Sequence, residues 1–176
     1  MKKKEIATQQ YSFETKNLEG ASDDFLEKTA PLIGYIVHRF NTLEETLNDA
    51  ICDIFHDDCH TTGLLVICKM NYSQKVDLFK RIWQTHQNLI QKKLPVFEEL
   101  TNNLTKAGEL RNQVVHADWE SAYDDGYTRC KLKVNAKGMQ HEYIQFSPEA
   151  LEEILELIDK TYDLFDQYED ELQSFW

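Results

Sequence analysis

Apolar residues recur every three or four positions along four segments of the chain, which is the pattern of amphipathic helices. The first segment begins near Asp23 or Pro31 and ends near Phe55. Pro31 suits the first turn of such a helix, because a missing N–H costs little there. The other three helices are expected near residues 71–90, 95–119 and 147–172, and a brief helix or turn is expected over 64–70.

The residues at the expected helix starts support these boundaries. Asn71 and Gln74 have the spacing of a capping box, in which each side chain accepts a hydrogen bond from the backbone of the other. Ser147 is a favourable N-cap, and Pro148 follows it at the first helical position. The second and fourth helices are therefore expected to begin at these residues.

Between the third and fourth helices the hydrophobic period changes from that of a helix to that of a strand. Residues 127–135 and 140–146 alternate apolar and polar side chains around Ala136-Lys137-Gly138, which predicts a β-hairpin. Each helix has one apolar stripe that must be buried against others. The expected fold is mainly α: a four-to-five-helix up-and-down bundle with one small β-hairpin inserted before the C-terminal helix. Residues 1–22 are expected to form a flexible leader, and residues 23–176 a single domain.

The composition is that of an ordinary soluble protein, with 41% hydrophobic and 28% charged residues. There is no apolar run of the roughly 20 residues that span a bilayer, and the basic N-terminus has no apolar stretch behind it. We therefore expect no membrane association and a cytoplasmic location. The irregular spacing of the cysteines favours reduced thiols over a disulfide framework. They are Cys52, Cys59, Cys68 and Cys130.

The net charge of −12 is concentrated at the C-terminal end of the chain. From Glu149 onward there are ten acidic residues and one basic residue, Lys160, so this segment carries −9 and the rest only −3. A basic groove for long nucleic-acid duplexes is excluded, because such binding needs many phosphate contacts. A small pocket with one or two cations is compatible with this charge. The acidic helix face is a solvated surface or, alternatively, a dock for a basic partner such as an antitoxin.

A cluster of Cys and His residues offers a metal-binding alternative. Zinc favours sulfur and nitrogen ligands, and four candidates lie within nine residues: Cys52, His56, Cys59 and His60. Their spacing matches no common zinc motif, and acidic residues stand between them. We therefore expect no metal and no cofactor, and keep a small metal-binding protein as the third and weakest hypothesis.

Arg111, Asn112 and His116, at the end of the third helix, are the candidate catalytic residues. The planar donor fork of Arg matches two phosphate oxygens, and an imidazole exchanges protons near neutral pH. This combination indicates chemistry on a phosphodiester. The alternative is structural, because Arg and His near a helix C-terminus favour its dipole, and Asp118 or Glu120 is a ready partner for Arg111.

Spacing alone does not distinguish this motif, because Arg81 and His86 have the same separation. Asn112, however, is polar and lies one helical turn before His116 on the same face. Arg81 is followed instead by apolar residues, and His86 falls on the buried stripe of its helix. We therefore interpret Arg81 and His86 as structural.

The order of elements resembles the HEPN superfamily, whose members are small helical bundles with an Arg, four to six residues, His signature. The resemblance covers most of residues 25–172. It depends on a long helix, a helix opened by Asn71-Tyr72-Ser73-Gln74-Lys75, and above all the segment 110–119. One subgroup has a Tyr, modified by a nucleotidyltransferase antitoxin, two residues after the His. Asp118 stands there in this chain, so that modification is not expected.

The resemblance implies a metal-independent endoribonuclease, a toxin or phage-defence effector, that acts as a homodimer with a composite site. His116 would then be the general base or acid at the ribose 2′-hydroxyl, and Arg111 would neutralise the scissile phosphate of a single-stranded or structured RNA. Asn112 would orient His116 or the phosphate. Some members of the family use the bundle only for dimerisation or ligand binding. A catalytically inactive module of that kind is therefore the alternative hypothesis.

Overall fold

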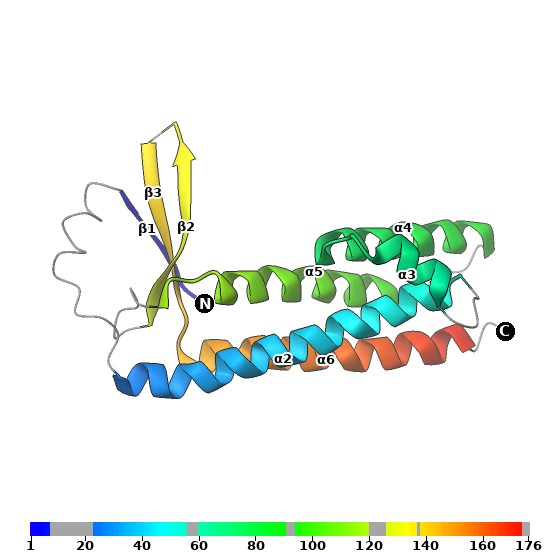
Figure 1. Ribbon diagram of the computed structural model, residues 1–176, viewed down its shortest axis with the longest axis horizontal. Coiled ribbons are helices and arrows are strands. Elements are labelled where there is room, and N and C mark those ends of the chain that lie inside the picture. Colours follow the sequence, from blue (N-terminus) through cyan, green and yellow to red (C-terminus); the bar gives the residue numbers. More distant parts are fainter. Residues whose placement is uncertain (8–22, 56–59, 91–93, 120–125, 137, 174–176) are drawn as a thin grey trace. The chain divides into compact units, whose positions relative to one another are not determined.

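The protein is mainly helical, with a small antiparallel sheet before its C-terminal helix (Figure 1). The computed structural model describes residues 1–7, 23–55, 60–90, 94–119, 126–136 and 138–173. The helices are α2 (Asp23–Asp53), α3 (Thr61–Ile67), α4 (Tyr72–Ile90), α5 (Pro95–Val115) and α6 (Pro148–Gln173). The strands are β1 (Lys3–Ala7), β2 (Tyr127–Asn135) and β3 (Gly138–Gln145). The fold class predicted from the sequence is confirmed.

The chain divides into two compact units. Unit 1 consists of Met1–Val37 and Leu110–Leu155 and contains the sheet, whereas unit 2 consists of His38–Glu109 and Glu156–Trp176. A single domain over residues 23–176 stays a prediction. Within the described ranges, none of the helices combines the length and the apolar character needed to cross a bilayer.

The helix starts follow the caps predicted from the sequence. The Asn71 N–H donates to Gln74 Oε1 at 2.9 Å, and the Gln74 N–H donates to Asn71 Oδ1 at 3.1 Å. At the start of α6 the Ala150 N–H donates to Ser147 Oγ at 3.3 Å. Because these bonds satisfy backbone donors that a helix leaves unpaired in its first turn, the starts of α4 and α6 are encoded locally.

Two features near the N-terminus differ from the expectation. Pro31 lies inside α2 and not in its first turn, because the helix already begins at Asp23. Its side chain is exposed, so water can satisfy the carbonyl that lacks an N–H partner. Residues 3–7, which we expected in a flexible leader, form β1 and pair antiparallel with β3. The remainder of the expected leader, 8–22, lies outside the described residues.

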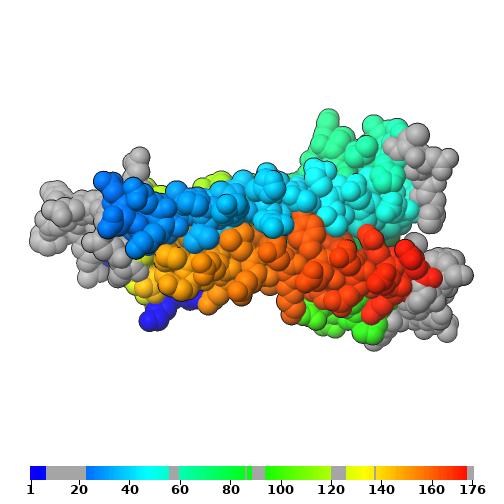
Figure 2. Space-filling model, turned by 90° about the horizontal axis from the view of Figure 1, so that it is seen from below, coloured from blue at the N-terminus to red at the C-terminus, as the bar shows by residue number. Residues whose placement is uncertain are grey.

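Aromatic side chains form the centre of unit 2. Phe79 of α4 is fully buried, and its ring centroid lies 5.5 Å from those of Phe97 and Tyr168 and 6.1 Å from that of Phe165. These tilted and edge-on arrangements are favourable for aromatic pairs, and they join α4 to α5 and α6. Also within unit 2, α2 and α6 lie side by side (Figure 2), and Arg39 Nε is 3.8 Å from Asp159 Oδ1.

Gly63 of α3 lies against α2 in a space too small for a side chain. A Cβ at this position would lie 2.6 Å from Cys52 Sγ and 2.7 Å from Cys52 Cα, and a backbone atom cannot rotate away. We expect Gly63→Ala to lower the free energy of unfolding in urea by about 1–3 kcal/mol. Gly34 of α2 is the control, because a Cβ there meets nothing within 4 Å. Gly34→Ala should stabilise by about 0.5–1 kcal/mol, and effects of the same sign would contradict this packing.

The sheet of unit 1 has strand order β1-β3-β2, and its pairing decides which side chains share a face. Lys131 lies opposite Glu142, and Leu132 lies opposite His141. The Glu142 carboxylate is buried and pairs with Lys3 and Lys133. These ion pairs lower the pKa of Glu142, with the Lys133 hydrogen bond as the largest cause. One face of the sheet is therefore a compensated ionic network, and the other carries His141.

Candidate functional site

The predicted motif lies where α5 ends. Arg111 and Asn112 belong to its last turn, and His116 directly follows the helix. The His116 N–H still donates to the Asn112 carbonyl at 3.1 Å, which places the histidine one turn after the asparagine. Arg111 Nη1 donates to Asn112 Oδ1 at 3.2 Å. The structure therefore brings Arg111 and Asn112 into direct contact and leaves the His116 side chain exposed.

The turn after α5 is held in place by the Val114 carbonyl. This oxygen accepts hydrogen bonds from the Trp119 indole Nε1 at 3.0 Å and from the Ala117 N–H at 3.4 Å. The Trp119 ring also packs on Phe146, with ring centroids 5.5 Å apart. The indole thus satisfies a carbonyl that the helix end leaves open, and it fixes the turn that carries His116.

Asp118 joins the same turn to the hairpin. Its N–H donates to the Arg129 carbonyl at 2.8 Å, as an isolated bridge to β2. Its carboxylate forms an ion pair with the Arg129 guanidinium. Both side chains are about one-third exposed, so the pair lies at the surface and not in the core. Arg129 is a partner of Asp118 that the sequence did not indicate.

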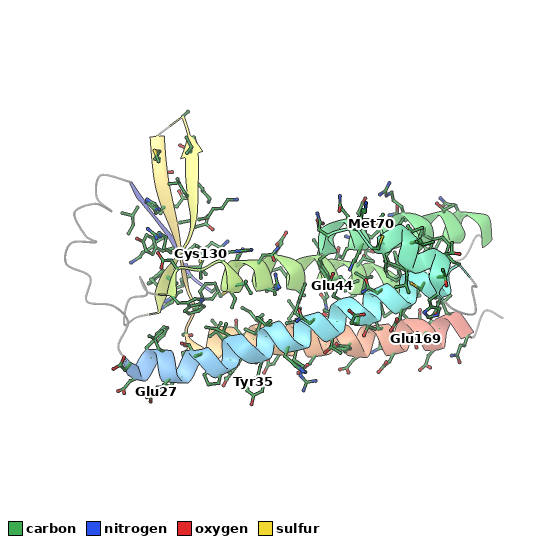
Figure 3. The ribbon with its side chains drawn as sticks, in the orientation of Figure 1. Glu27, Tyr35, Glu44, Met70, Cys130 and Glu169 are labelled. Carbon is green, nitrogen blue, oxygen red and sulfur yellow. The ribbon has the colours of Figure 1, made fainter. Side chains whose placement is uncertain are left out.

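A pocket of about 250 Å³ lies between this turn and the hairpin. It is lined by His116, Asp118, Arg129, Cys130, Lys131, Leu132 and His141. Cys130, labelled in Figure 3, marks its position on β2. Of the three predicted catalytic residues, His116 lines the pocket, whereas Arg111 and Asn112 are not among its lining residues. The pocket combines two imidazoles with two cationic side chains and one carboxylate.

A β-bulge brings the hairpin side chains to this pocket. The pairing register shifts between Arg129 and Lys131, so Cys130 is an extra residue on β2. Side chains alternate between faces along a regular strand, which would place Arg129 and Leu132 on opposite faces. With the extra residue, Arg129 pairs with Tyr143 and Leu132 with His141. Arg129 and Leu132 therefore share the face that carries His141.

The pKa shifts in the pocket define what its groups can do. Burial lowers the pKa of His141, and the neighbouring Arg129 charge lowers it further. The His141 imidazole is therefore neutral at pH 7 and able to accept a proton. Burial raises the pKa of the Cys130 thiol to about 11. Because the thiolate is the reactive form, Cys130 is no nucleophile near neutral pH.

The Cys and His residues of the metal-binding hypothesis are only partly described. His56 and Cys59 lie outside the described residues. Cys52 is buried, which raises the pKa of its thiol, and His60 Nε2 lies 2.9 Å from Asp53 Oδ1. Across the part of the chain that the structure describes, no three His, Cys, Asp or Glu side chains are grouped so as to hold a metal ion.

The competing pair with the same spacing lies elsewhere in the fold. Arg81 is exposed on α4, where its Nη2 lies 2.7 Å from Asp77 Oδ2 one turn earlier. Such surface pairs contribute little to stability. The side chain of His86 lies outside the described residues, so its structural role stays a prediction.

Sequence reasoning missed three residues of the pocket: Arg129, Lys131 and His141. A signal was present, because β2 contains three basic residues and no acidic one in a chain of net charge −12. A scan against protein-family models, a search of curated proteins and a search of solved structures each gave no match for the chain. The side chains of the site are thus the only guide to its chemistry.

Proposed function

We propose that this protein is a metal-independent endoribonuclease of the HEPN type, in which His116 acts on the ribose 2′-hydroxyl. The observation that carries the proposal is the placement of the exposed His116 imidazole in a pocket with a second imidazole and two cationic side chains. Proton transfer and neutralisation of phosphate charge are the two requirements for cleaving RNA without a metal. This pocket holds groups suited to both.

In the proposed reaction His116 removes the proton from the 2′-hydroxyl. The 2′-oxygen then forms a bond to the adjacent phosphorus, and the bond from phosphorus to the 5′-oxygen breaks as that oxygen gains a proton. The products are a 2′,3′-cyclic phosphate and a 5′-hydroxyl. Arg111 neutralises the charge that develops on the phosphate oxygens. Asn112 is a positioning residue, because its Oδ1 accepts a hydrogen bond from Arg111 Nη1.

The proposed enzyme acts as a homodimer. Arg111 lies one helical turn before His116 but does not line the pocket of its own chain. A second copy facing the end of α5 would bring its Arg111 to the phosphate held at His116, and two copies would double the positive charge of the site. This arrangement supports a composite site over two independent ones.

Dimerisation gives a separate prediction. At micromolar concentration, light scattering should return twice the chain mass of 20.7 kDa. Because the composite site needs both copies, specific cleavage per chain should fall when the protein is diluted below the dissociation constant of the dimer. A strict monomer with full cleavage activity would contradict the composite site.

We further propose a cytoplasmic toxin or phage-defence effector. The cysteines fit a reducing compartment, because Cys52, Cys68 and Cys130 are free thiols. The exposed acidic residues of α6, among them Glu152, Glu153 and Glu156, suit a basic antitoxin as partner. Toxicity on expression that disappears with His116→Ala would support this role, and equal toxicity of the variant would contradict it.

One observation favours the alternative, a ligand-binding module without catalysis. The Asp118 carboxylate pairs with Arg129 inside the pocket and removes part of its positive charge. The two functions separate in one assay, in which the purified protein is incubated with a broad RNA panel in EDTA. Cleavage that depends on His116 supports the endoribonuclease. RNA that stays intact over the whole panel, although it binds, would establish the module.

A further inference from the structure

We infer that the hairpin side of the pocket is a phosphate-binding subsite, in which Lys131 and Arg129 supply positive charge and His141 supplies a hydrogen bond. The subsite deepens the proposed function, on which its assignment to RNA rests. It would hold a phosphate next to the scissile one. Phosphate binding itself is measurable without any cleavage.

The charge of the sheet is the first support. Its three strands contain five basic and two acidic side chains, a net charge of +3 in a chain of −12. Lys133 is occupied on the other face by Glu5 and Glu142. Lys131 and Arg129 line the pocket instead. The pocket therefore lies at a locally positive part of an acidic chain, which attracts an anion.

The Asp118 carboxylate does not prevent anion binding. It occupies part of the Arg129 guanidinium, which has five N–H donors and can bind two oxygen-bearing groups at once. The carboxylate also repels an incoming phosphate, so its charge sets the affinity of the pocket. Removal of that charge is therefore expected to strengthen phosphate binding, an effect that damage to the fold would not produce.

An apolar strip beside the charged groups indicates a nucleotide and not free phosphate. Leu132 lines the pocket opposite His141 and is 47% exposed. The next same-face pair, Val134 and Met139, is also exposed. A sugar or base placed on this strip would bury apolar surface while its phosphate meets Lys131. A nucleotide should therefore bind more tightly than inorganic phosphate.

Binding should depend on pH through the imidazoles. The charged and titratable groups that face His141 come from the turn after α5 and from β2, and its partner on β1 is the non-ionisable Ile6. They are His116, Asp118, Arg129, Cys130 and Lys131. Burial and Arg129 lower the pKa of His141, so this imidazole becomes a cation only as the pH falls below its ordinary range. Phosphodiester affinity should rise over that acidic interval.

The test is a calorimetric titration with a deoxythymidine dinucleotide, which lacks the 2′-hydroxyl and cannot be cleaved by this chemistry. Its phosphodiester also keeps one charge between pH 5 and 8. Inorganic phosphate in a parallel arm distinguishes a nucleotide from free phosphate. We expect Lys131→Ala and His141→Gln each to weaken dinucleotide binding, by roughly tenfold for the loss of a charge-assisted contact. Asp118→Asn should strengthen it by about fivefold.

Matched controls are Lys69→Ala and His38→Ala, two exposed residues outside the pocket. Neither should change dinucleotide affinity. Unchanged affinity in Lys131→Ala, His141→Gln and Asp118→Asn would overturn the subsite, even if RNA is cleaved. Dinucleotide binding with the expected variant effects, in a protein that never cleaves RNA, would keep the subsite and refute the endoribonuclease. Equal affinity for inorganic phosphate would contradict the nucleotide assignment.

Discussion

His116→Ala should abolish detectable RNA cleavage, with a loss of about 100-fold to 10,000-fold in rate. Positioned general acid–base catalysis contributes rate enhancements of this size. The side chain lines the pocket and is exposed, so its removal leaves no buried cavity. Loss of activity with an unchanged urea midpoint would therefore report on chemistry and not on folding.

His38→Ala is the matched control for this substitution. His38 is exposed on α2, and it does not line the pocket. Its loss should leave the cleavage rate unchanged. If His116→Ala retains the rate of the unmodified protein, or if both variants lose it equally, His116 has no role in proton transfer.

Arg111→Ala should slow cleavage by about 100-fold to 1,000-fold, the range found when one donor to a developing oxyanion is removed. The guanidinium is half-buried and bonds to Asn112, so it is held in a defined orientation. Arg111→Lys keeps the charge but loses the bidentate fork, and its rate should lie between those of the two proteins. The measurement is single-turnover cleavage of one labelled RNA in EDTA.

Arg81→Ala is the control for the arginine, because Arg81 begins the second Arg-and-His pair with the same spacing. It forms a surface ion pair with Asp77, and exposed pairs of this kind contribute little. Cleavage should be unaffected. Equal losses in Arg111→Ala and Arg81→Ala would mean that the spacing, and not the pocket beside His116, had been mistaken for a site.

The helical part of the fold could be predicted because its determinants lie close together in sequence. The reciprocal Asn71 and Gln74 bonds and the Ser147 cap define helix starts within one turn. β1 could not be predicted in this way. Its partner is β3, far along the chain, and Lys3-Lys4-Glu5 shows no alternation of apolar and polar residues. Pairing at a sheet edge, not local preference, makes it a strand.

The candidate site was predictable to the same limited extent. Arg111, Asn112 and His116 lie within one and a half turns of a helix, so their proximity follows from the sequence. Arg129 and His141 reach the pocket only because of the bulge at Cys130, which changes the face that Arg129 shares. A bulge has no clear sequence signature here. The basic character of β2 was the single cue to its role.

The ends of the cleavage products test the central claim most directly. A single-stranded RNA is incubated with the unmodified protein in EDTA, and the fragments are analysed by mass spectrometry. Attack by the 2′-oxygen predicts 2′,3′-cyclic phosphate and 5′-hydroxyl ends, and a DNA strand of the same sequence should stay intact. Fragments with 3′-hydroxyl and 5′-phosphate ends, cleavage of the DNA, or intact RNA over a broad panel would contradict the proposed reaction at His116.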